Sequence, residues 1–246
     1  MQITRIDTIP VGSFVYVKIH TGDGLYGVGE ASLSGRQTAV LGALEQISPV
    51  LIGCDATRIE HIWQDIYRGT FWRGGPVLQS ALAGIDIALW DLNGKALGVP
   101  VHRLLGGLAR QKVLVYRHVG GNTPAQLVER SQALLDEGWK VLRISPIVCG
   151  EDTDHRADVG FDPTRAILNG VAHMAALREG VGPEVEIIFE VHTRLSPTRA
   201  IELCRQLEPY RPFFVEDPIR SENPGAFRTL RQQTSVAIGT GEQLHD

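Results

Sequence analysis

The stretches Ile187-Ile-Phe-Glu-Val-His192, Phe213-Phe-Val-Glu-Asp-Pro218 and Ile238-Gly-Thr-Gly-Glu242 decide the fold of this chain. Each is a short apolar run of β-forming residues that closes on a glutamate, which predicts a buried strand with a carboxylate at its carboxyl end. The glutamates are 26 residues apart in both steps, from 190 to 216 and from 216 to 242. That interval accommodates one strand, one helix and two loops, so it indicates consecutive units of a parallel βα array.

The three glutamates predict a metal site. Parallel strands of a closing barrel carry their carboxyl ends to one mouth, where barrel enzymes keep their chemistry. Three carboxylates gathered there repel one another strongly unless a cation lies between them. Oxygen ligands without cysteine favour Mg²⁺ over zinc. Glu190, Glu216 and Glu242 are therefore the expected Mg²⁺ ligands, and the alternative for any one of them is a helix cap or an arginine partner.

Composition excludes several classes of function. The chain has 246 residues, 43% hydrophobic and 21% charged, with a net charge of −4, and it contains no basic run. A binder of phosphate backbones would be basic, so we expect no nucleic-acid partner. No apolar stretch reaches the roughly 18 residues that span a bilayer, and the N-terminus lacks a basic segment followed by an apolar core. We expect a cytoplasmic protein that does not bind a membrane.

Residues 1–111 predict a small α+β domain. Strand-like alternation covers residues 2–10, 13–20 and 25–30. Helical periodicity follows over residues 37–52 and 56–70 and from Pro76 to a stop at Gly98. Leu78, Ala81, Leu82, Ile85, Leu89 and Leu92 are the expected buried stripe of the long helix.

Residues 112–246 predict the first part of an α/β barrel. Strands over 112–117, 140–145, 186–191, 212–216 and 235–239 alternate with helices over 124–137, 163–179, 197–207 and 223–232. A complete eightfold barrel takes about 250 residues, whereas 135 follow position 111. We therefore expect an incomplete barrel with about five strands, whose C-terminal strands are missing.

Three stretches of the first domain resemble the mandelate racemase and muconate lactonizing enzyme group of the enolase superfamily. They are Tyr67-Arg-Gly-Thr-Phe-Trp-Arg-Gly-Gly-Pro76, Ser80-Ala-Leu-Ala-Gly-Ile-Asp-Ile-Ala-Leu-Trp-Asp-Leu-Asn-Gly-Lys95 and Gly98-Val-Pro-Val-His-Arg-Leu-Leu-Gly-Gly107. Glu190-Val-His-Thr-Arg194 and Leu207-Glu-Pro-Tyr-Arg-Pro212 are similar to its acid-sugar dehydratases, the galactonate and mannonate branch. The resemblance covers the whole chain and implies a capping domain followed by a TIM-like (β/α)₇β barrel.

The resemblance implies a hydro-lyase. The expected reaction is Mg²⁺-dependent dehydration of an aldonate to a 2-keto-3-deoxy acid, by abstraction of the proton α to the carboxylate. Such a proton is too weakly acidic unless a cation neutralises the charge that develops on the enediolate. Two alternatives remain open: a racemase, epimerase or cycloisomerase of the same superfamily, and a truncated, inactive paralogue that binds at most metal or ligand.

Two further expectations concern the chain as a whole. We expect the 246 residues alone to be inactive, because the resemblance implies that the missing strands supply a further histidine base and a carboxylate near the substrate. We also expect them to be poorly soluble, because an unpaired strand at a sheet edge promotes association. The resemblance implies a homo-oligomer for the full-length protein.

The resemblance also suggests roles for three residues of the barrel. At the position of His192 the dehydratases carry a general acid that protonates the departing β-hydroxyl, and strand alternation places it beside Glu190 if the strand continues. Racemases of the group have a Lys-x-Lys base motif where this chain has Arg143. We interpret Arg143 as a carboxylate clamp or charge partner, or as a plain ion-pairing arginine. His118 resembles a substrate contact of the mannonate branch.

Residues of the capping loops and of the following barrel loop complete the predicted site. Arg36, Trp72 and Arg73 are expected to face the mouth and contact the hydroxyls and carboxylate of the substrate, although Trp72 equally suits core packing between domains. The mannonate branch pairs its arginine with a loop tyrosine, but residues 146–162 contain none. His155 is the candidate to replace it, or an ordinary loop histidine. At position 190 the family usually has aspartate, so the longer Glu190 is a departure.

Overall fold

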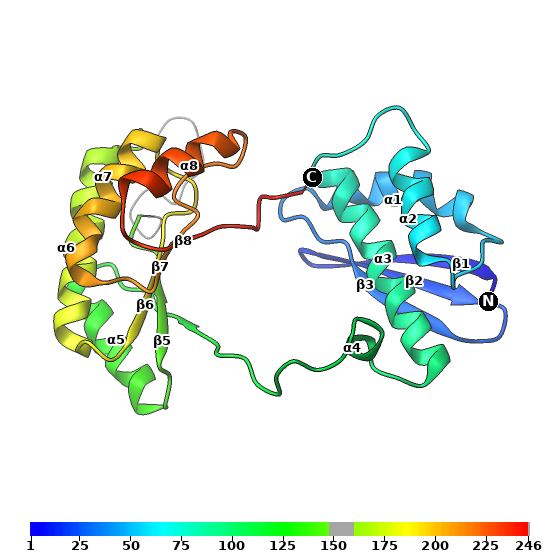
Figure 1. Cartoon of the computed structure of the whole chain (residues 1–246), viewed down its shortest axis with the longest axis horizontal. Coiled ribbons are helices and arrows are strands. Elements are labelled where there is room, and N and C mark those ends of the chain that lie inside the picture. Colours follow the sequence, from blue (N-terminus) through cyan, green and yellow to red (C-terminus); the bar gives the residue numbers. More distant parts are fainter. Residues whose placement is uncertain (148–159, 246) are drawn as a thin grey trace. The chain divides into compact units, whose positions relative to one another are not determined.

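The chain folds into two compact units, Met1–Lys112 and Val113–Leu244 (Figure 1). A computed structural model describes residues 1–147 and 160–245. Each unit has a hydrophobic core of its own.

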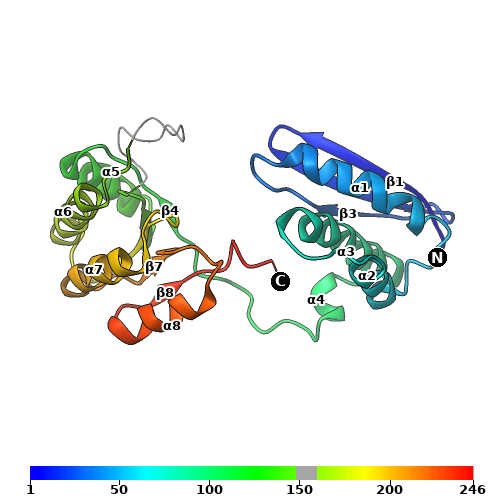
Figure 2. The ribbon, with the colours of Figure 1, turned by 90° about the horizontal axis from the view of Figure 1, so that it is seen from above.

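The N-terminal unit is a three-stranded antiparallel sheet with the strand order β1-β2-β3. Helices cover this sheet (Figure 2). Its elements are β1 (Ile3–Val11), β2 (Phe14–Thr21), β3 (Tyr26–Glu30), α1 (Gln37–Leu51), α2 (Ile59–Arg68), α3 (Pro76–Leu97) and α4 (Val101–Leu104). The α+β class predicted from the sequence is confirmed. The predicted strands and long helices occur at or close to the expected bounds.

Sequence pattern explains how this sheet meets its helices. Alternate residues of β2, Val15, Val17 and Ile19, are fully buried against the helical layer. On β3 the inward positions are Gly27 and Gly29, and α3 lies so close that a Cβ atom at either glycine would overlap the backbone of Ala88 or Gly84. The two glycines therefore set the spacing between sheet and helix.

Three details of this unit differ from expectation. Helix α2 begins at Ile59 rather than residue 56 because Asp55 holds the chain in a turn, accepting hydrogen bonds from the backbone N and the hydroxyl of Thr57. Leu78 was expected in the core but is 39% exposed, since it lines a cavity beside α3. The short helix α4 was not predicted.

The C-terminal unit is a five-stranded parallel sheet in the order β4-β5-β6-β7-β8, with helices on one face (Figure 1). Its elements are β4 (Arg117–His118), α5 (Pro124–Asp136), β5 (Val141–Ile144), α6 (Pro163–Val181), β6 (Glu186–Glu190), α7 (Pro197–Leu207), η1 (Glu208–Tyr210), β7 (Phe214–Glu216), α8 (Pro224–Gln233) and β8 (Ile238–Gly239). The prediction of a partial α/β barrel with five strands is confirmed.

The helical face of this sheet is a continuous apolar core. Leu142, Ile187, Phe189 and Val215 point into it and pack against side chains of the helices such as Met174. Their neighbours along each strand point to the opposite face, which is the concave side of the partial barrel.

The strand predicted over Lys112–Arg117 is wrong, because only its last residue lies in β4. Strand β5 begins at Val141, and Arg117 pairs with Leu142, the second residue of β5. Residues before Tyr116 therefore extend past the end of β5, and Val113–Tyr116 are exposed.

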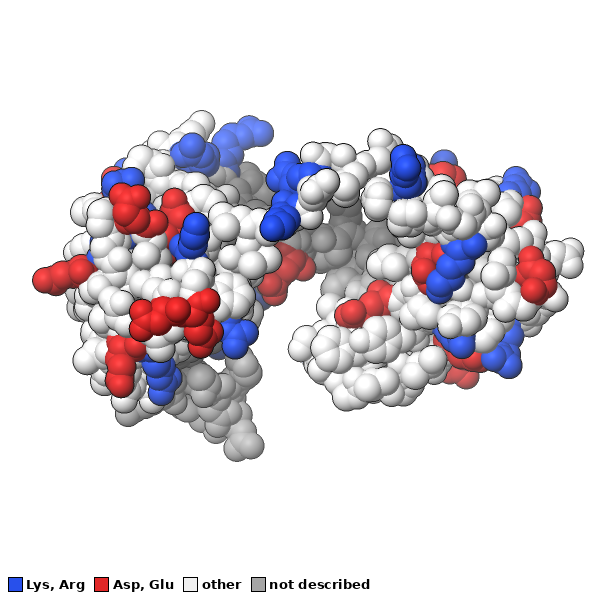
Figure 3. Space-filling model, turned by 90° about the horizontal axis from the view of Figure 1, so that it is seen from below, with Lys and Arg blue, Asp and Glu red and all other residues white. Residues whose placement is uncertain are grey.

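Charges of both signs are interspersed over the face seen in Figure 3, as is usual for a protein with a small net charge. Within residues 1–147 and 160–245, no helix has the length and apolar character needed to cross a membrane.

Candidate metal and substrate site

Four of the predicted site residues share the concave face of the parallel sheet. Strand register pairs His118 with Arg143, Arg143 with Ile188, and Glu190 with Glu216. Because side chains alternate along each strand, these residues project to one side, opposite the apolar core. Glu190 and Glu216 are the last residues of β6 and β7, as the sequence predicted.

Arg143 joins the two carboxylates. Its Nε donates to Glu216 Oε2 at 2.5 Å, and its Nη2 donates to Glu190 Oε2. The side chains of Arg143 and Glu190 are only 10% and 2% exposed, and that of Glu216 is 19% exposed. Two carboxylates this close repel each other, and the guanidinium offsets that repulsion where little water is available to do so.

His192 lies beside Glu190, but not for the reason expected from strand alternation. The strand ends at Glu190, and His192 and Thr193 have φ angles of 55° and 60°, in the left-handed region. The resulting turn lets the backbone N of His192 donate to Glu190 Oε1 at 2.5 Å and brings His192 Nδ1 to 3.6 Å from the same oxygen. The imidazole is 51% exposed, so it is accessible to a small molecule at this end of the sheet.

Glu242 is placed apart from the other two glutamates. Strand β8 ends at Gly239, and Glu242 is exposed in the turn that follows. In the described residues, no three Asp, Glu, His or Cys side chains are gathered closely enough to hold a metal ion. The structure thus brings Glu190 and Glu216 together and leaves Glu242 three residues beyond the end of the next strand.

Glu190 and Glu216 suit a hard divalent cation. Both are oxygen donors, and the cationic group of Arg143 already lies between them as a stand-in for such an ion. Glu242 is the nearest acidic residue along the chain after β8, and its turn would have to close toward the other two to complete a set of three.

His118 completes the row of side chains on the concave face. Arg143 Nη1 lies 3.2 Å from His118 Nδ1, and the ring of Tyr116 stacks on the imidazole with a centroid separation of 5.5 Å. Partial burial, and next the positive charge of Arg143, lower the pKa of His118 below the ordinary histidine value. A neutral imidazole can accept a hydrogen bond from a substrate hydroxyl.

One residue at this edge was not singled out from the sequence. Asp217, between Glu216 and Pro218, is 3% exposed and its carboxylate accepts a hydrogen bond from the Thr240 hydroxyl at 2.8 Å. The signal available in the sequence was an aspartate at the end of an apolar run and directly before proline, because proline restricts the backbone of the residue before it and a carboxylate at a buried strand end needs a partner.

Arg36, Trp72 and Arg73 belong to the N-terminal unit, where they do not share one environment. Arg36 is exposed and donates to the carbonyl of Gly35. Trp72 is 80% exposed and makes an edge contact with Phe71, so it is not part of the core of its own unit. The guanidinium of Arg73 lies 5.6 Å from the centre of the Tyr67 ring.

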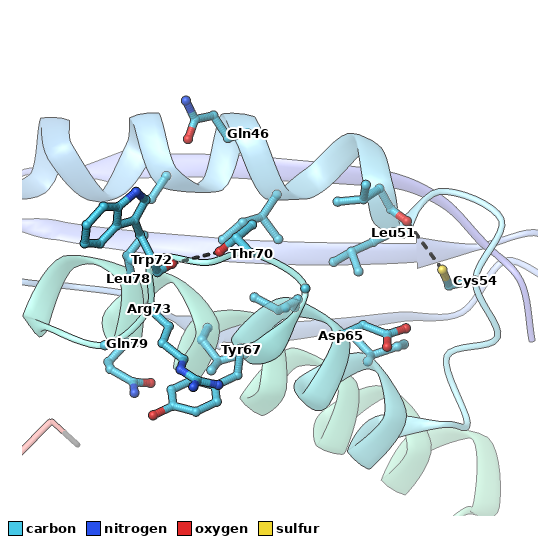
Figure 4. Close-up of a pocket in the computed structure, with 18 residues that line it drawn as sticks. Gln46, Leu51, Cys54, Asp65, Tyr67, Thr70, Trp72, Arg73, Leu78 and Gln79 are labelled. Carbon is cyan, nitrogen blue, oxygen red and sulfur yellow. Dashed lines mark hydrogen bonds between the residues drawn. The ribbon is translucent and has the colours of Figure 1, made fainter.

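Trp72 and Arg73 line a cavity within the N-terminal unit (Figure 4). It has a volume of about 620 Å³ and is bordered by α1, α2, the start of α3 and the loop between α2 and α3. Its floor is apolar, with side chains such as Ile47 and Ile66, and Gln46 and Gln79 add polar groups. The candidate loop residue His155 lies outside the described residues.

Comparison with known families assigns both units. Residues 2–106 match the family described as mandelate racemase / muconate lactonizing enzyme, N-terminal domain, and residues 126–246 match the enolase C-terminal domain-like family.

Two curated relatives of this chain are sugar-acid dehydratases. The chain is 40% identical to a D-mannonate dehydratase of Sphingomonas sp. (strain SKA58), over 96% of this chain and 63% of the relative. It is also 40% identical to a D-galactonate dehydratase of Ralstonia nicotianae, over 99% of this chain and 62% of the relative. The chain therefore spans just under two thirds of the length of these curated relatives.

Solved structures agree with this assignment. An enolase from Pantoea ananatis with bound D-gluconate and Mg superposes with a TM-score of 0.91 at 35% identity, over 99% of this chain and 66% of that one. A member of the enolase superfamily from Salmonella Typhimurium gives a TM-score of 0.90 at 30% identity, over 98% and 68%.

Proposed function

This chain belongs to the mandelate racemase and muconate lactonizing enzyme family of the enolase superfamily. From that membership we propose that its function is that of a Mg²⁺-dependent hydro-lyase acting on a sugar acid. The substrate class is an aldonate such as gluconate, galactonate or mannonate, and the product is a 2-keto-3-deoxy acid. The observation that carries the proposal is the pair Glu190 and Glu216, held side by side at strand ends with a cationic group between them.

The proposed ligands of Mg²⁺ are Glu190 and Glu216, with Glu242 as the third. When bound, the ion would neutralise the negative charge that develops on the substrate carboxylate as the neighbouring proton leaves. Glu190 carries one methylene more than the aspartate usual in the family. Its carboxylate is nevertheless fixed by the backbone N of His192 and by Arg143, which supports its assignment as a ligand.

His192 is the proposed general acid. Its Nδ1 lies 3.6 Å from Glu190 Oε1, within the range of an ion pair. The Nε2 atom on the other side of the ring would then deliver its proton to the departing β-hydroxyl, which leaves as water. An imidazole suits this step because its pKa lies near the working pH.

Arg143 and His118 are the proposed substrate contacts of the barrel. A guanidinium is a poor base, so Arg143 serves as a clamp for a carboxylate. That property disfavours the racemase alternative, which needs a base at this strand end. We also predict that the substrate contacts Arg36, Trp72 and Arg73. A homo-oligomeric state and a cytoplasmic location are further predictions.

The proposal is tested by metal-dependent binding of the aldonate. We expect the 246-residue chain to bind at least one of D-gluconate, D-galactonate and D-mannonate in isothermal titration calorimetry when Mg²⁺ is present, and to lose that binding in EDTA. Glu216→Gln should abolish it, whereas Glu222→Gln, a change in an exposed pair with Arg220, should not. Aldonate binding that is equal with and without Mg²⁺ would contradict the proposal. The same samples are assayed for 2-keto-3-deoxy acid, which shows whether these residues suffice for turnover.

A further inference from the structure

Unusual backbone geometry is concentrated at the ends of β6 and β7. In residues 1–147 and 160–245, four residues other than glycine have positive φ: His192, Thr193, Arg211 and Asp217. Three of them, all but Arg211, lie within three residues after the strands that end in Glu190 and Glu216. Left-handed geometry is costly for residues with a Cβ atom and persists where surrounding contacts enforce it, often at functional sites.

Asp217 is the most constrained of the three. Its φ is 41°, and the following Pro218 narrows the backbone conformations available to it still further. The residue is 3% exposed, so its conformation must be maintained by contacts inside the protein.

Those contacts connect three neighbouring strand ends. The backbone N of Asp217 donates to the carbonyl of Gly239 at 2.9 Å, and the carbonyl of Asp217 accepts from the backbone N of Thr193 at 2.7 Å. Its Oδ1 accepts from the Thr240 hydroxyl at 2.8 Å. One residue therefore ties the turn after Glu190 to the segment that leads to Glu242, while it follows Glu216 directly in the chain.

We propose that Asp217 is a positioning residue that sets the relative placement of Glu190, Glu216 and Glu242 by joining the ends of β6, β7 and β8. This inference rests on the proposed function, because it assumes that these glutamates bind the metal. Of the three hydrogen bonds of Asp217, the one from the Thr240 hydroxyl is nearest to Glu242, because Thr240 precedes Glu242 by two residues. It keeps the start of the Glu242 turn beside the end of β7, so that the turn has less far to close toward the other two carboxylates, and it raises metal affinity without touching the ion.

The test substitutes Thr240, since changing its side chain leaves the strained backbone of Asp217 in place. Affinity for Mn²⁺, used as a probe for Mg²⁺, is measured by electron paramagnetic resonance for wild type, Thr240→Val and Thr240→Ser. We expect Thr240→Val to weaken binding by about tenfold, the low end for groups that orient metal ligands. Thr240→Ser keeps the hydroxyl and should stay within about twofold of wild type.

Thr234→Val is the matched control. The Thr234 hydroxyl also donates to a carboxylate, that of Glu208 at 3.1 Å, but it lies before β8 at the end of the strand opposite to the proposed site. Urea unfolding of both valine variants measures how much free energy of unfolding is lost with a hydrogen bond from threonine to a carboxylate. Thr234→Val should lose stability yet bind Mn²⁺ like wild type.

The outcomes separate this inference from the proposed function. If wild type binds Mn²⁺ and Thr240→Val binds it equally well, or if both valine variants weaken binding alike, Asp217 is not a positioning residue and the metal site stands. If wild type shows no saturable Mn²⁺ binding, the proposed function itself fails. A selective loss in Thr240→Val, restored in Thr240→Ser, supports the inference.

Discussion

At the scale of single residues, the site is an electrostatic balance around Arg143. Glu190 is buried and Glu216 is partly buried, and both direct an oxygen to the same guanidinium. Breaking a buried ion pair by removing one partner leaves an uncompensated charge, which is among the most destabilising of single changes. The same arrangement means that a divalent cation and Arg143 compete for the same oxygens.

Replacing Arg143 should therefore lower the stability of the metal-free chain and change its response to a divalent cation. Arg143→Met is expected to lower the free energy of unfolding of the metal-free chain by about 3–5 kcal/mol, and Mn²⁺ should restore more stability to the variant than it adds to wild type. Urea unfolding with and without Mn²⁺ measures both effects. Arg220→Met, which removes an exposed ion pair with Glu222, should cost about 1 kcal/mol or less. Equal costs for the two variants would contradict this account.

The environment of His118 predicts an unusual titration. Partial burial and Arg143 lower its pKa, so the folded state keeps the imidazole neutral at a pH where the unfolded chain is already protonated. Folding stability from this group is accordingly complete above the unfolded pKa of about 6.5 and declines as pH falls below it. In NMR titrations the His118 midpoint should lie below the ordinary value and rise in Arg143→Met. A midpoint at or above the ordinary value would refute the assigned cause.

At the scale of elements, the N-terminal unit protects one edge of its sheet, the edge formed by β3. The backbone N of Val28 on β3 donates to Asp91 Oδ2 at 2.8 Å, and Lys95 Nζ donates to the carbonyl of Tyr26 at 3.2 Å. Both side chains come from α3 and pair with each other at 2.5 Å. Side chains of the helix thus satisfy edge groups that would otherwise be free to bind another strand.

Removing one of these side chains should weaken the edge. Asp91→Ala leaves the N–H of Val28 without its acceptor and is expected to cost about 1–2 kcal/mol of stability. Asp65→Ala also removes a helix aspartate with an i,i+4 partner, but its exposed pair with His61 supports no strand, so about 0.5 kcal/mol or less is expected. Urea unfolding compares the two, and a cost for Asp91→Ala no greater than that for Asp65→Ala would count against edge protection.

Glycines in this unit should respond to alanine in opposite directions. Gly29→Ala forces a Cβ atom into the backbone of Gly84 on α3, where nothing can yield without moving the helix, so a loss of about 3 kcal/mol or more is expected. Gly42 lies inside α1 with open space where its Cβ would be. Gly42→Ala should therefore raise stability by about 0.5–1 kcal/mol. Thermal or urea unfolding measures both changes, and a tolerated Gly29→Ala would show that β3 and α3 are less closely packed than described.

Elements were predictable where a periodic pattern had one interpretation. The alternation of β2 and the long apolar stripe of α3 gave nearly correct bounds, and the glutamates that end β6 and β7 were placed correctly. The strand over Lys112–Arg117 was wrong because an apolar pattern does not reveal whether a neighbouring strand is long enough to pair with it. The left-handed turn at His192 and the bond from Arg143 to Glu190 had no sequence signal, since both depend on contacts between strands distant in the chain.

At the scale of the whole molecule, two units with separate cores carry the two halves of the family's pattern. The barrel unit holds every predicted metal ligand, together with Arg143, His118 and His192. The N-terminal unit holds Arg36, Trp72 and Arg73. The proposed metal site thus lies wholly within the C-terminal unit, and it can be tested independently of the contacts proposed for the N-terminal unit.

The most direct test of the account is a Mn²⁺ titration of the 246-residue chain, with Glu190→Gln, Glu216→Gln and Glu242→Gln beside wild type and Glu222→Gln as the control. We predict one saturable site per chain that Mg²⁺ displaces, an affinity at least about tenfold weaker in each of the three site variants, and an unchanged affinity in the control. The loss follows from replacing a charged oxygen ligand by a neutral one. Absence of saturable binding, or wild-type affinity in Glu190→Gln and Glu216→Gln, would contradict the claim that these strand-end carboxylates form a metal site.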